Sequence, residues 1–366
     1  MTGAQDTGVA RKSTSCAIAR LLPGLALALA IAAVATGLGR LAPVIGAPVL
    51  AILLGIGIRE LLDRTRPVPI KAGAAFAGKY ILQAAIVFLG AQLSLANVLK
   101  VGVGSLPIML GSLLACLAMA ALLGRWLRIE NPLRTLIGVG TGVCGASAIA
   151  AATGVLQASR AAVAYAVSTI MVFNVTAVLV FPPIGHLLGM DQESFGLWAG
   201  TAINDTSSVV AAAYSYGTEA GDYAVIVKLT RALTIIPIVL GLSYLAARRA
   251  RGAAEAGAGA GGDAGADASG DSGKKIRPWK LIPAFLPLFL LATVVNSVGL
   301  IPASWHGTIT TLSTFGIATA LAGIGLGTRL GELRSAGWRP LAFGGLLSLT
   351  VALSSLGIQI AMGGLR

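Results

Sequence analysis

The sequence contains few charged and few aromatic residues. Of its 366 residues, 11% are Asp, Glu, Lys or Arg and 5% are Phe, Trp or Tyr, whereas about a quarter of a soluble domain is charged. Hydrophobic residues make up 56%, and the mean hydropathy is +0.85. The apolar runs approach the roughly 20 residues that span hydrocarbon and exceed the roughly 4–8 residues of buried strands. These features argue against a soluble α/β enzyme and predict an all-α, polytopic transmembrane bundle in a lipid bilayer.

Cysteines and catalytic motifs are also scarce. Cys16, Cys116 and Cys144 lie in or beside apolar segments and form no CxxC pair, so neither a disulfide framework nor a zinc site is predicted. No nucleophile–base pair, metal motif or nucleotide-binding loop is visible, so we expect no enzyme and no cofactor or metal. The net charge of +13 comes from cations in loops, which indicates membrane orientation rather than nucleic-acid binding.

Eleven apolar segments have lengths close to those of spanning helices. They cover residues 17–38, 43–62, 79–97, 103–124, 132–157, 162–188, 195–216, 222–246, 281–300, 308–328 and 339–362. Because Lys and Arg concentrate in cytoplasmic loops, the loop charges predict a cytoplasmic N-terminus and an external C-terminus.

One stretch divides the chain. Residues 248–279 are mostly Gly, Ala, Ser and Asp, which cannot bury a core, so we expect a flexible cytoplasmic linker. The predicted organisation is a cytoplasmic tail at 1–15, segments one to eight at 16–247, the linker at 248–279 and segments nine to eleven at 280–366.

Internal similarity predicts inverted repeats. Phe88–Leu114 resembles Leu321–Ser348: each has a Gly, a small polar step, spaced Leu residues and a Pro-led helix. The copies are seven segments apart, an odd offset, so they would have opposite orientations, as in inverted-repeat transporters.

A second similarity concerns a polar break. GTGVCGASAIAAA (Gly140–Ala152) aligns without a gap with GTAINDTSSVVAA (Gly200–Ala212). Irregular backbone survives in hydrocarbon where it is buried in protein or lines a cavity, so each break predicts part of a site. We expect two discontinuous helices that span the membrane. Re-entrant hairpins are the alternative, and positions 159 and 191 would then lie on opposite sides from those expected.

The breaks define the candidate site. Ser147 is expected to cap the second half of the first broken helix, and Asp205, Thr206 or Ser207 that of the second. Half-helix starts present N–H groups to an anion. Lys228 and Arg231 share one helix face inside the membrane, where a cation usually has an ion-pair partner or a functional role. The candidate substrate-binding residues are Cys144, Gly145, Ser147, Asn204, Asp205, Thr206, Ser207, Ser208, Lys228 and Arg231.

Asp205 has two interpretations, and both stay open. It is the carboxylate in the middle of an apolar segment. It either caps a half-helix and pairs with Lys228 or Arg231, or exchanges a proton or coupling cation with the pathway.

Three motifs carry a family resemblance. GVCGASAIAAATGVLQA, FGLWAGTAINDTSSVVAAA and VKLTRALTIIPIV resemble signature regions of the YeiH family of bacterial inner-membrane proteins, also called a sulfate exporter family. The resemblance runs from about Val44 to Leu349 and omits the linker. Where that family has a His-Asp-Thr-Ala-Gln-like run, Asn204–Ser208 keeps the Asp and Thr and lacks the His and Gln. The resemblance implies inverted repeats with crossed, broken helices, as in the cation–proton antiporter and bile-acid symporter superfamily.

These features support two functional hypotheses. The first is a secondary transporter that exports a small anion, such as sulfate or an organosulfur oxyanion, by alternating access coupled to H⁺ or Na⁺. Ser147, Thr206 and Ser207 would contact the anion, and Lys228 and Arg231 would neutralise it. The alternative is a cation–proton antiporter or a Na⁺-coupled organic-anion carrier in which Asp205 binds the cation. A homodimer is considered in both cases.

Overall fold

The computed structural model describes residues 7–41, 46–65, 70–244, 248, 283–328 and 338–364. This part of the chain is a bundle of helices and contains no strand, which confirms the expected all-α fold. The helices are α1 (Thr7–Leu41), α2 (Gly46–Thr65), α3 (Lys71–Phe76), the π-helical η1 (Ala77–Ile81), α4 (Leu82–Gly90), α5 (Leu95–Trp126), α6 (Leu133–Gly142), α7 (Ala146–Leu156), α8 (Arg160–Leu187), α9 (Gln192–Ala202), α10 (Thr206–Tyr216), α11 (Thr218–Ala232), α13 (Phe285–Ser297), α14 (Ala303–Gly327) and α15 (Trp338–Ala361).

Several of these elements join into longer helices. Elements α3, η1 and α4 follow one another without a gap, so residues 71–90 form one helix. Residues 235–244 are helical and continue α11 after a turn at 233–234. Seven helices of the described chain are long and apolar enough to cross a membrane. Helix α2 has the length, 20 residues, but ends in a charged stretch.

Helix ends differ from expectation where charges occur. The third segment begins at Lys71 rather than near 79, because Lys71 and Lys79 interrupt the hydropathy of an otherwise Ala- and Gly-rich helix. The first begins at Thr7 rather than near 17, so part of the expected tail is helical. The expected linker at 248–279 lies outside the described residues, apart from Arg248.

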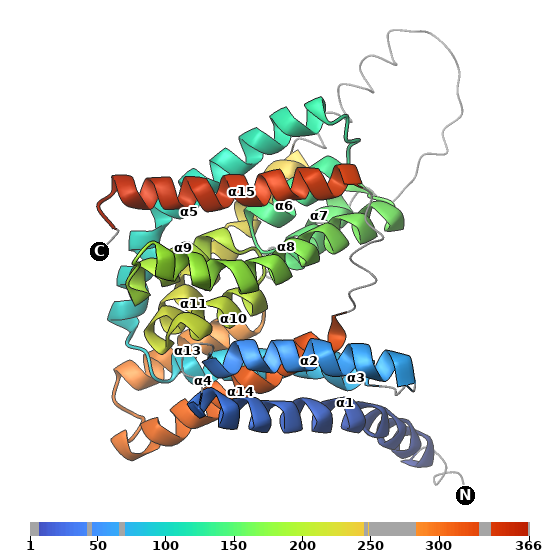
Figure 1. Cartoon of the computed structure of the whole chain (residues 1–366), viewed down its shortest axis with the longest axis vertical. Helices are drawn as coiled ribbons and strands as arrows, with labels where there is room; N and C mark the ends of the chain where they lie inside the picture. Colours follow the sequence, from blue (N-terminus) through green and yellow to red (C-terminus); the bar gives the residue numbers. More distant parts are fainter. Residues whose placement is uncertain are drawn as a thin grey trace, which may run out of the picture.

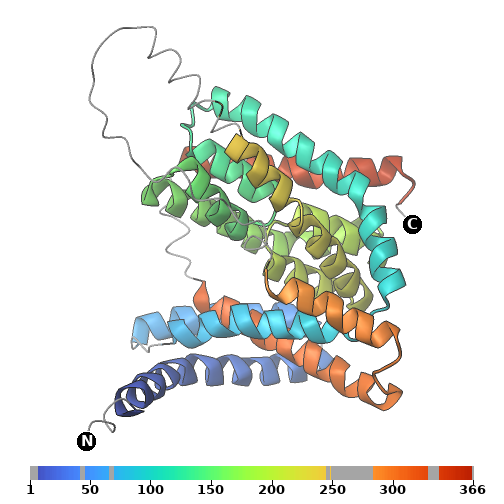
Figure 2. The same ribbon diagram turned by 180° about the vertical axis from the view of Figure 1, so that it is seen from behind.

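The helices form two groups, which are separated in both views (Figures 1 and 2). The first group, at the bottom of Figure 1, contains α1, α2, the helix at 71–90, α13 and α14. The second group contains α5 to α11 and α15. Helix α10 contacts α2 and so joins the groups. Apolar clusters fill each group, and one of them extends from α1 and α14 to Val210 and Val225 of the second.

The spanning helices define two sides. We call the side where α1 begins the N-side and the side where α15 ends the C-side (Figure 1). The helix at 71–90 ends on the C-side, and a short turn leads into α5, which therefore ends on the N-side. Helix α14 runs antiparallel to the helix at 71–90, since Thr310 binds Gln92 while Ser313 binds the Ala85 carbonyl further along. The two helices therefore have opposite orientations, as the inverted repeat predicts.

The second polar break forms a hairpin, because both ends of the α9–α10 unit lie together on the C-side. The rings of Phe195 and Tyr216 stack with centroids 3.9 Å apart. The Gln192 side chain accepts hydrogen bonds from the backbone N–H groups of Glu219 (3.0 Å) and Ala220 (3.3 Å). The Ser194 hydroxyl donates to the Gly364 carbonyl just after α15, which fixes the side. Helix α9 therefore runs inward and α10 runs back out.

The first polar break forms a hairpin from the opposite side. Arg134, at the start of α6, packs on Gly124 near the end of α5, so α6 begins on the N-side. A Cβ added to Gly140 would lie 2.9 Å from Cγ1 of Ile149, which folds α7 back along α6. Leu133 and Leu156, at the outer ends of the two arms, pack against one apolar cluster. Helix α8 then starts on the N-side and crosses the bundle.

The expectation that both broken helices span the membrane is therefore wrong. The structure has two re-entrant hairpins that begin on opposite sides. About 24 residues would be short for a hairpin whose arms each crossed the membrane. Each arm of a hairpin, however, needs to reach only the middle of the membrane. The eleven residues of α9 rise about 16 Å, which is half of the roughly 30 Å hydrocarbon core.

Two glycines fix how α9 lies on α11. A Cβ added to Gly196 would lie 2.7 Å from the Ala220 carbonyl oxygen, and one on Gly200 would lie 2.9 Å from the Ala224 carbonyl oxygen. The backbones of α9 and α11 thus touch at two positions four residues apart, as at small-residue helix contacts in membranes. This contact aligns the second hairpin with the helix that contains Lys228 and Arg231.

Substitution of Gly196 tests this packing. Gly196→Ala should destabilise the protein by about 1–3 kcal/mol, because the added methyl overlaps backbone that cannot move independently. The check is a lower midpoint of thermal unfolding in detergent. Gly241→Ala is the matched control, since a Cβ at Gly241 meets nothing within 4 Å and alanine favours the helix. Equal midpoints for both variants would contradict the contact.

Cysteine accessibility tests the hairpins. In a background without native cysteines, Arg160→Cys should react with an impermeant reagent from the same side as Arg128→Cys, and Glu193→Cys from the same side as Lys100→Cys. All four positions are exposed; Arg128 follows the end of the spanning helix α5, and Lys100 lies in its second turn, near the other end. Spanning broken helices require both pairings to be reversed.

Candidate functional site

The first hairpin turns at a glycine. Gly145 has φ +67°, a left-handed conformation that favours glycine, and its N–H donates to the Gly140 carbonyl (2.9 Å). Helix α7 starts directly after Gly145 without a side-chain cap. Ser147 was expected to cap α7, and that is wrong: it is the second residue of the helix, and its side chain is exposed.

The second hairpin turns at Ile203–Asp205, where α10 is capped by Asp205. One carboxylate oxygen of Asp205 accepts from the Ser207 N–H (3.0 Å) and from the Ser207 hydroxyl. The backbone N–H of Asp205 donates to Oδ1 of Asn174 on α8 (3.3 Å). Among the three expected caps, the structure therefore selects Asp205, and Asn174 attaches the turn to a neighbouring helix.

The two turns meet inside the second group. A Cβ on Gly145 would lie 3.7 Å from Cβ of Asp205 and 3.8 Å from the carbonyl carbon of Asn204. Cys144 is buried among apolar residues that include Val139, Ile235 and Val239. The structure thus brings the candidate residues of the two motifs to one place, with Asp205 to Ser208 partly buried and Ser147 exposed.

Lys228 and Arg231 bind backbone carbonyls at both turns. The Lys228 ammonium donates to the carbonyls of Ile203 (2.8 Å) and Val143 (3.3 Å). The Arg231 guanidinium donates to the carbonyls of Gly142 (2.7 Å), Thr141 (3.3 Å) and Thr201. Both side chains are buried. In the described chain neither cation forms an ion pair with Asp205, so the capping interpretation holds without the pairing to Lys228 or Arg231 that accompanied it.

These acceptors are carbonyls in the last turns and at the C-caps of α6 and α9, where carbonyls have no helical N–H partner. Helix C-termini carry a partial negative charge, so cations stabilise them. Because Lys228 and Arg231 lie three residues apart on α11, one helix face serves both hairpins. The two cations thus bind the tips of the hairpins to α11.

The helices that begin after the two breaks present N-termini, which have the opposite polarity to the C-termini of α6 and α9. Helices α7 and α10 both begin at the meeting point, and helix N-termini attract anions. The N-terminus of α10 is occupied by the Asp205 carboxylate, whereas α7 has a glycine in that position and no side-chain cap. Among the described residues, no group of three His, Cys, Asp or Glu side chains is arranged to hold a metal ion.

Two polar residues of this region were not among the sequence candidates. Asn174 of α8 accepts a hydrogen bond from the Asp205 N–H at the turn of the second hairpin. Ser348 of α15 lies beside Asn204 in one cavity. A lone amide in an apolar segment is a usable signal for Asn174. Serine is common in membrane helices, so no local signal identifies Ser348.

Comparisons with known proteins identify the family. A protein-family model described as "Conserved hypothetical protein 698" matches residues 23–344. A UPF0324 membrane protein from Streptococcus pyogenes serotype M3 is 41% identical over 355 residues, which cover 94% of this chain and 98% of the relative. UPF0324 membrane proteins from Streptococcus mutans and Clostridium tetani are 37% and 38% identical, covering 93% and 87% of this chain and 97% and 90% of the relatives.

The chain belongs to the YeiH, or UPF0324, family of membrane proteins. The family resemblance seen in its three motifs is thereby confirmed. No solved structure matches the chain.

Replacement of the buried cations tests the carbonyl contacts. Arg231→Met should destabilise the protein by about 3 kcal/mol or more, because each buried carbonyl left unpaired costs about 1–3 kcal/mol. Lys228→Met should cost less, since it frees two carbonyls rather than three. The check is the midpoint of thermal unfolding in detergent.

The matched control is Arg160→Met, which removes an exposed arginine and should change stability by less than about 0.5 kcal/mol. If Arg231→Met unfolds at the same temperature as Arg160→Met, the carbonyl contacts do not hold the hairpins.

Proposed function

We propose that this membrane protein is a secondary transporter of a small anion that works by alternating access. The observation that supports the proposal best is the meeting of two re-entrant hairpins that begin on opposite sides. Transporters of several folds place substrate and coupling ions near mid-depth, at helix ends within inverted repeats. A site between hairpins from both sides can be exposed to either side when the surrounding helices move.

The proposed anion site lies at the start of α7. The N-cap residue of α7 is Gly145, which has no side chain to cap the first turn, and the Cys144 thiol lies beside the Ala148 N–H of that turn. Ser147, Thr206, Ser207 and Ser208 offer hydroxyls, and Asn204 an amide. Lys228 and Arg231 bind carbonyls, so they would neutralise the anion through their field rather than by direct contact. Sulfate and organosulfur oxyanions are the proposed substrates, and export is the proposed direction.

Asp205 is proposed to couple transport to an H⁺ or Na⁺ gradient. It is partly buried next to Gly145, and it forms no ion pair with Lys228 or Arg231. A carboxylate in this position can gain a proton or bind a cation, and either event changes the charge at the turn.

The alternative function is a cation–proton antiporter or a Na⁺-coupled organic-anion carrier. The pairing of the Asp205 carboxylate with the Ser207 hydroxyl favours it, because hard cations take oxygen ligands. In this version the cation binds at the turn of the second hairpin, and Lys228 and Arg231 supply the fixed positive charge.

The cellular setting is also a proposal. Cations of the described chain that lie towards the N-side include Lys71, Arg125, Arg128, Arg134, Arg160, Arg248 and Arg339, whereas Asp191, Glu193, Glu219 and Asp222 lie at the C-side. By the positive-inside rule, the N-side faces the cytoplasm of a bacterial cell and the protein lies in the inner membrane. We further propose a homodimer, no enzymatic activity, no cofactor and no nucleic-acid partner.

The function is tested in proteoliposomes that contain the full chain. Labelled sulfate and a labelled alkanesulfonate are offered with an imposed H⁺ or Na⁺ gradient. Gradient-dependent flux of either anion supports the proposal. Cation flux without anion flux favours the alternative, and the absence of both would contradict a secondary transporter.

Asp205→Asn separates capping from coupling. Asparagine caps a helix about as well as aspartate, so stability should fall by less than about 1 kcal/mol. Gradient-driven flux should fall at least tenfold if the charge couples transport, and exchange without a gradient should persist. The measurements are flux with and without a gradient.

Asp191→Asn is the matched control, because Asp191 caps α9 in the same way, with its carboxylate accepting from the Ser194 N–H (2.7 Å). Asp191 is exposed and lies far from the turn. Equal gradient-driven flux in the two variants would show that Asp205 is a cap alone.

A further inference from the structure

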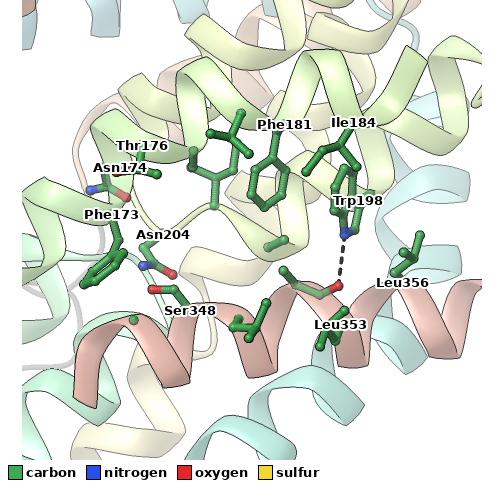
Figure 3. A pocket seen from close by; sticks show the side chains of 17 residues that line it. Phe173, Asn174, Thr176, Phe181, Ile184, Trp198, Asn204, Ser348, Leu353 and Leu356 are labelled. Carbon is green, nitrogen blue, oxygen red and sulfur yellow. Dashed lines mark hydrogen bonds between the residues drawn. The ribbon is translucent and has the colours of Figure 1, made fainter. Parts of the chain in front are cut away.

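A cavity lies beside the turn of the second hairpin, and its lining residues are drawn in Figure 3. It has a volume of about 270 Å³ and lies between α8, α9 and α15. Its walls are mainly apolar and include Phe173, Phe181 and Trp198, and the Trp198 indole donates to the Ala352 carbonyl (3.0 Å). At its outer edge Val180 and Leu353 are 43% and 59% exposed, on a surface that would face lipid.

The inner end of this cavity is polar, and three of its polar atoms have no partner within the described chain. Nδ2 of Asn174, Oδ1 of Asn204 and Oγ of Ser348 are buried and unpaired within the described chain. All three residues line the cavity and are labelled in Figure 3. Asn174 and Asn204 are each 2% exposed.

The orientation of the Asn174 amide is determined by the protein. Its Oδ1 accepts from the Asp205 N–H, so its Nδ2 is the donor that remains for an occupant. Oδ1 of Asn204 can accept, and the Ser348 hydroxyl can do either. A buried polar group without a partner costs about 1–3 kcal/mol, so three at one end of a cavity indicate an occupant.

The chemistry of the lining defines that occupant. No charged side chain lines the cavity, so an anionic or cationic head would lose its hydration without compensation. The head must accept from Asn174 and donate to Asn204. The apolar walls require an apolar body. One water takes about 30 Å³, so a single water cannot fill the space.

We propose that this cavity binds an amphipathic molecule with an uncharged hydroxyl or carboxamide head and an alkyl chain. The head occupies the polar end at Asn174, Asn204 and Ser348, and the chain passes Trp198 and leaves between α8 and α15. This site shares Asn204 with the proposed anion site at α7 but does not rest on the proposed transport.

Photolabelling tests the proposal. The full chain in nanodiscs is irradiated with decan-1-ol that carries a diazirine in its chain, and adducts are mapped by mass spectrometry. We expect saturable adducts on lining residues such as Phe181 and Trp198, and competition by unlabelled decan-1-ol. A probe with the same alkyl chain and diazirine but a sulfonate head should give no saturable labelling.

Three variants make the test specific. Ser348→Ala removes a hydroxyl that has no partner in the described chain, so the fold should be retained, and half-saturation should require about three- to tenfold more probe for one lost hydrogen bond. Ala177→Leu fills the cavity and should abolish saturable labelling. Ser354→Ala on the same helix, outside the cavity lining, is the matched control and should label as the parent does.

Non-saturable labelling, or equal labelling in all variants, would mean that the probe reports the lipid-facing surface and that water alone occupies the polar end. This would overturn the proposal. Saturable labelling in a protein that transports no anion would count against the proposed function and not against this site.

Discussion

The pairing of backbone carbonyls at mid-depth is the constraint on which the second group depends. A half-helix that ends inside a membrane protein exposes its last carbonyls where no lipid group can bind them, and each unpaired group costs several kcal/mol. Lys228 and Arg231 bind these carbonyls on α6 and α9. A cation at this depth is itself costly, at least about 2.5–3.5 kcal/mol. The hairpins and the buried cations therefore require each other.

This arrangement leaves the two N-terminal ends unequal. Both α7 and α10 begin where the turns meet, but Asp205 and Ser207 satisfy the start of α10, whereas Gly145 leaves α7 without a cap. A fixed carboxylate at both ends would have made the region closed to anions. The difference between an aspartate and a glycine at corresponding points of two similar motifs is the physical basis for proposing an anion at one of them.

Most of the helical segments could be predicted from the sequence, but not the direction in which the arms of the two broken helices run. Hydropathy identified the apolar segments, and the cost of buried charge singled out Lys228, Arg231 and Asp205. Hydropathy measures the length of an apolar run, and a span and a hairpin of about 24 residues have the same length. The contacts that distinguish them, such as that of Gln192 with Glu219, join residues 27 positions apart. Likewise, the cap expected at Ser147 is replaced by the left-handed Gly145, because a turn between antiparallel arms needs that conformation.

Asn174 connects the two sites that the structure suggests. Its Oδ1 accepts from the N–H of Asp205, and its Nδ2 is free for an occupant of the cavity. A hydrogen bond donated by Nδ2 polarises the amide, which makes Oδ1 a better acceptor. An occupied cavity would therefore hold the turn at Asp205 more firmly against α8 than an empty one. In the proposed occupied state, this single amide would link the tip of the second hairpin to the molecule bound in the cavity.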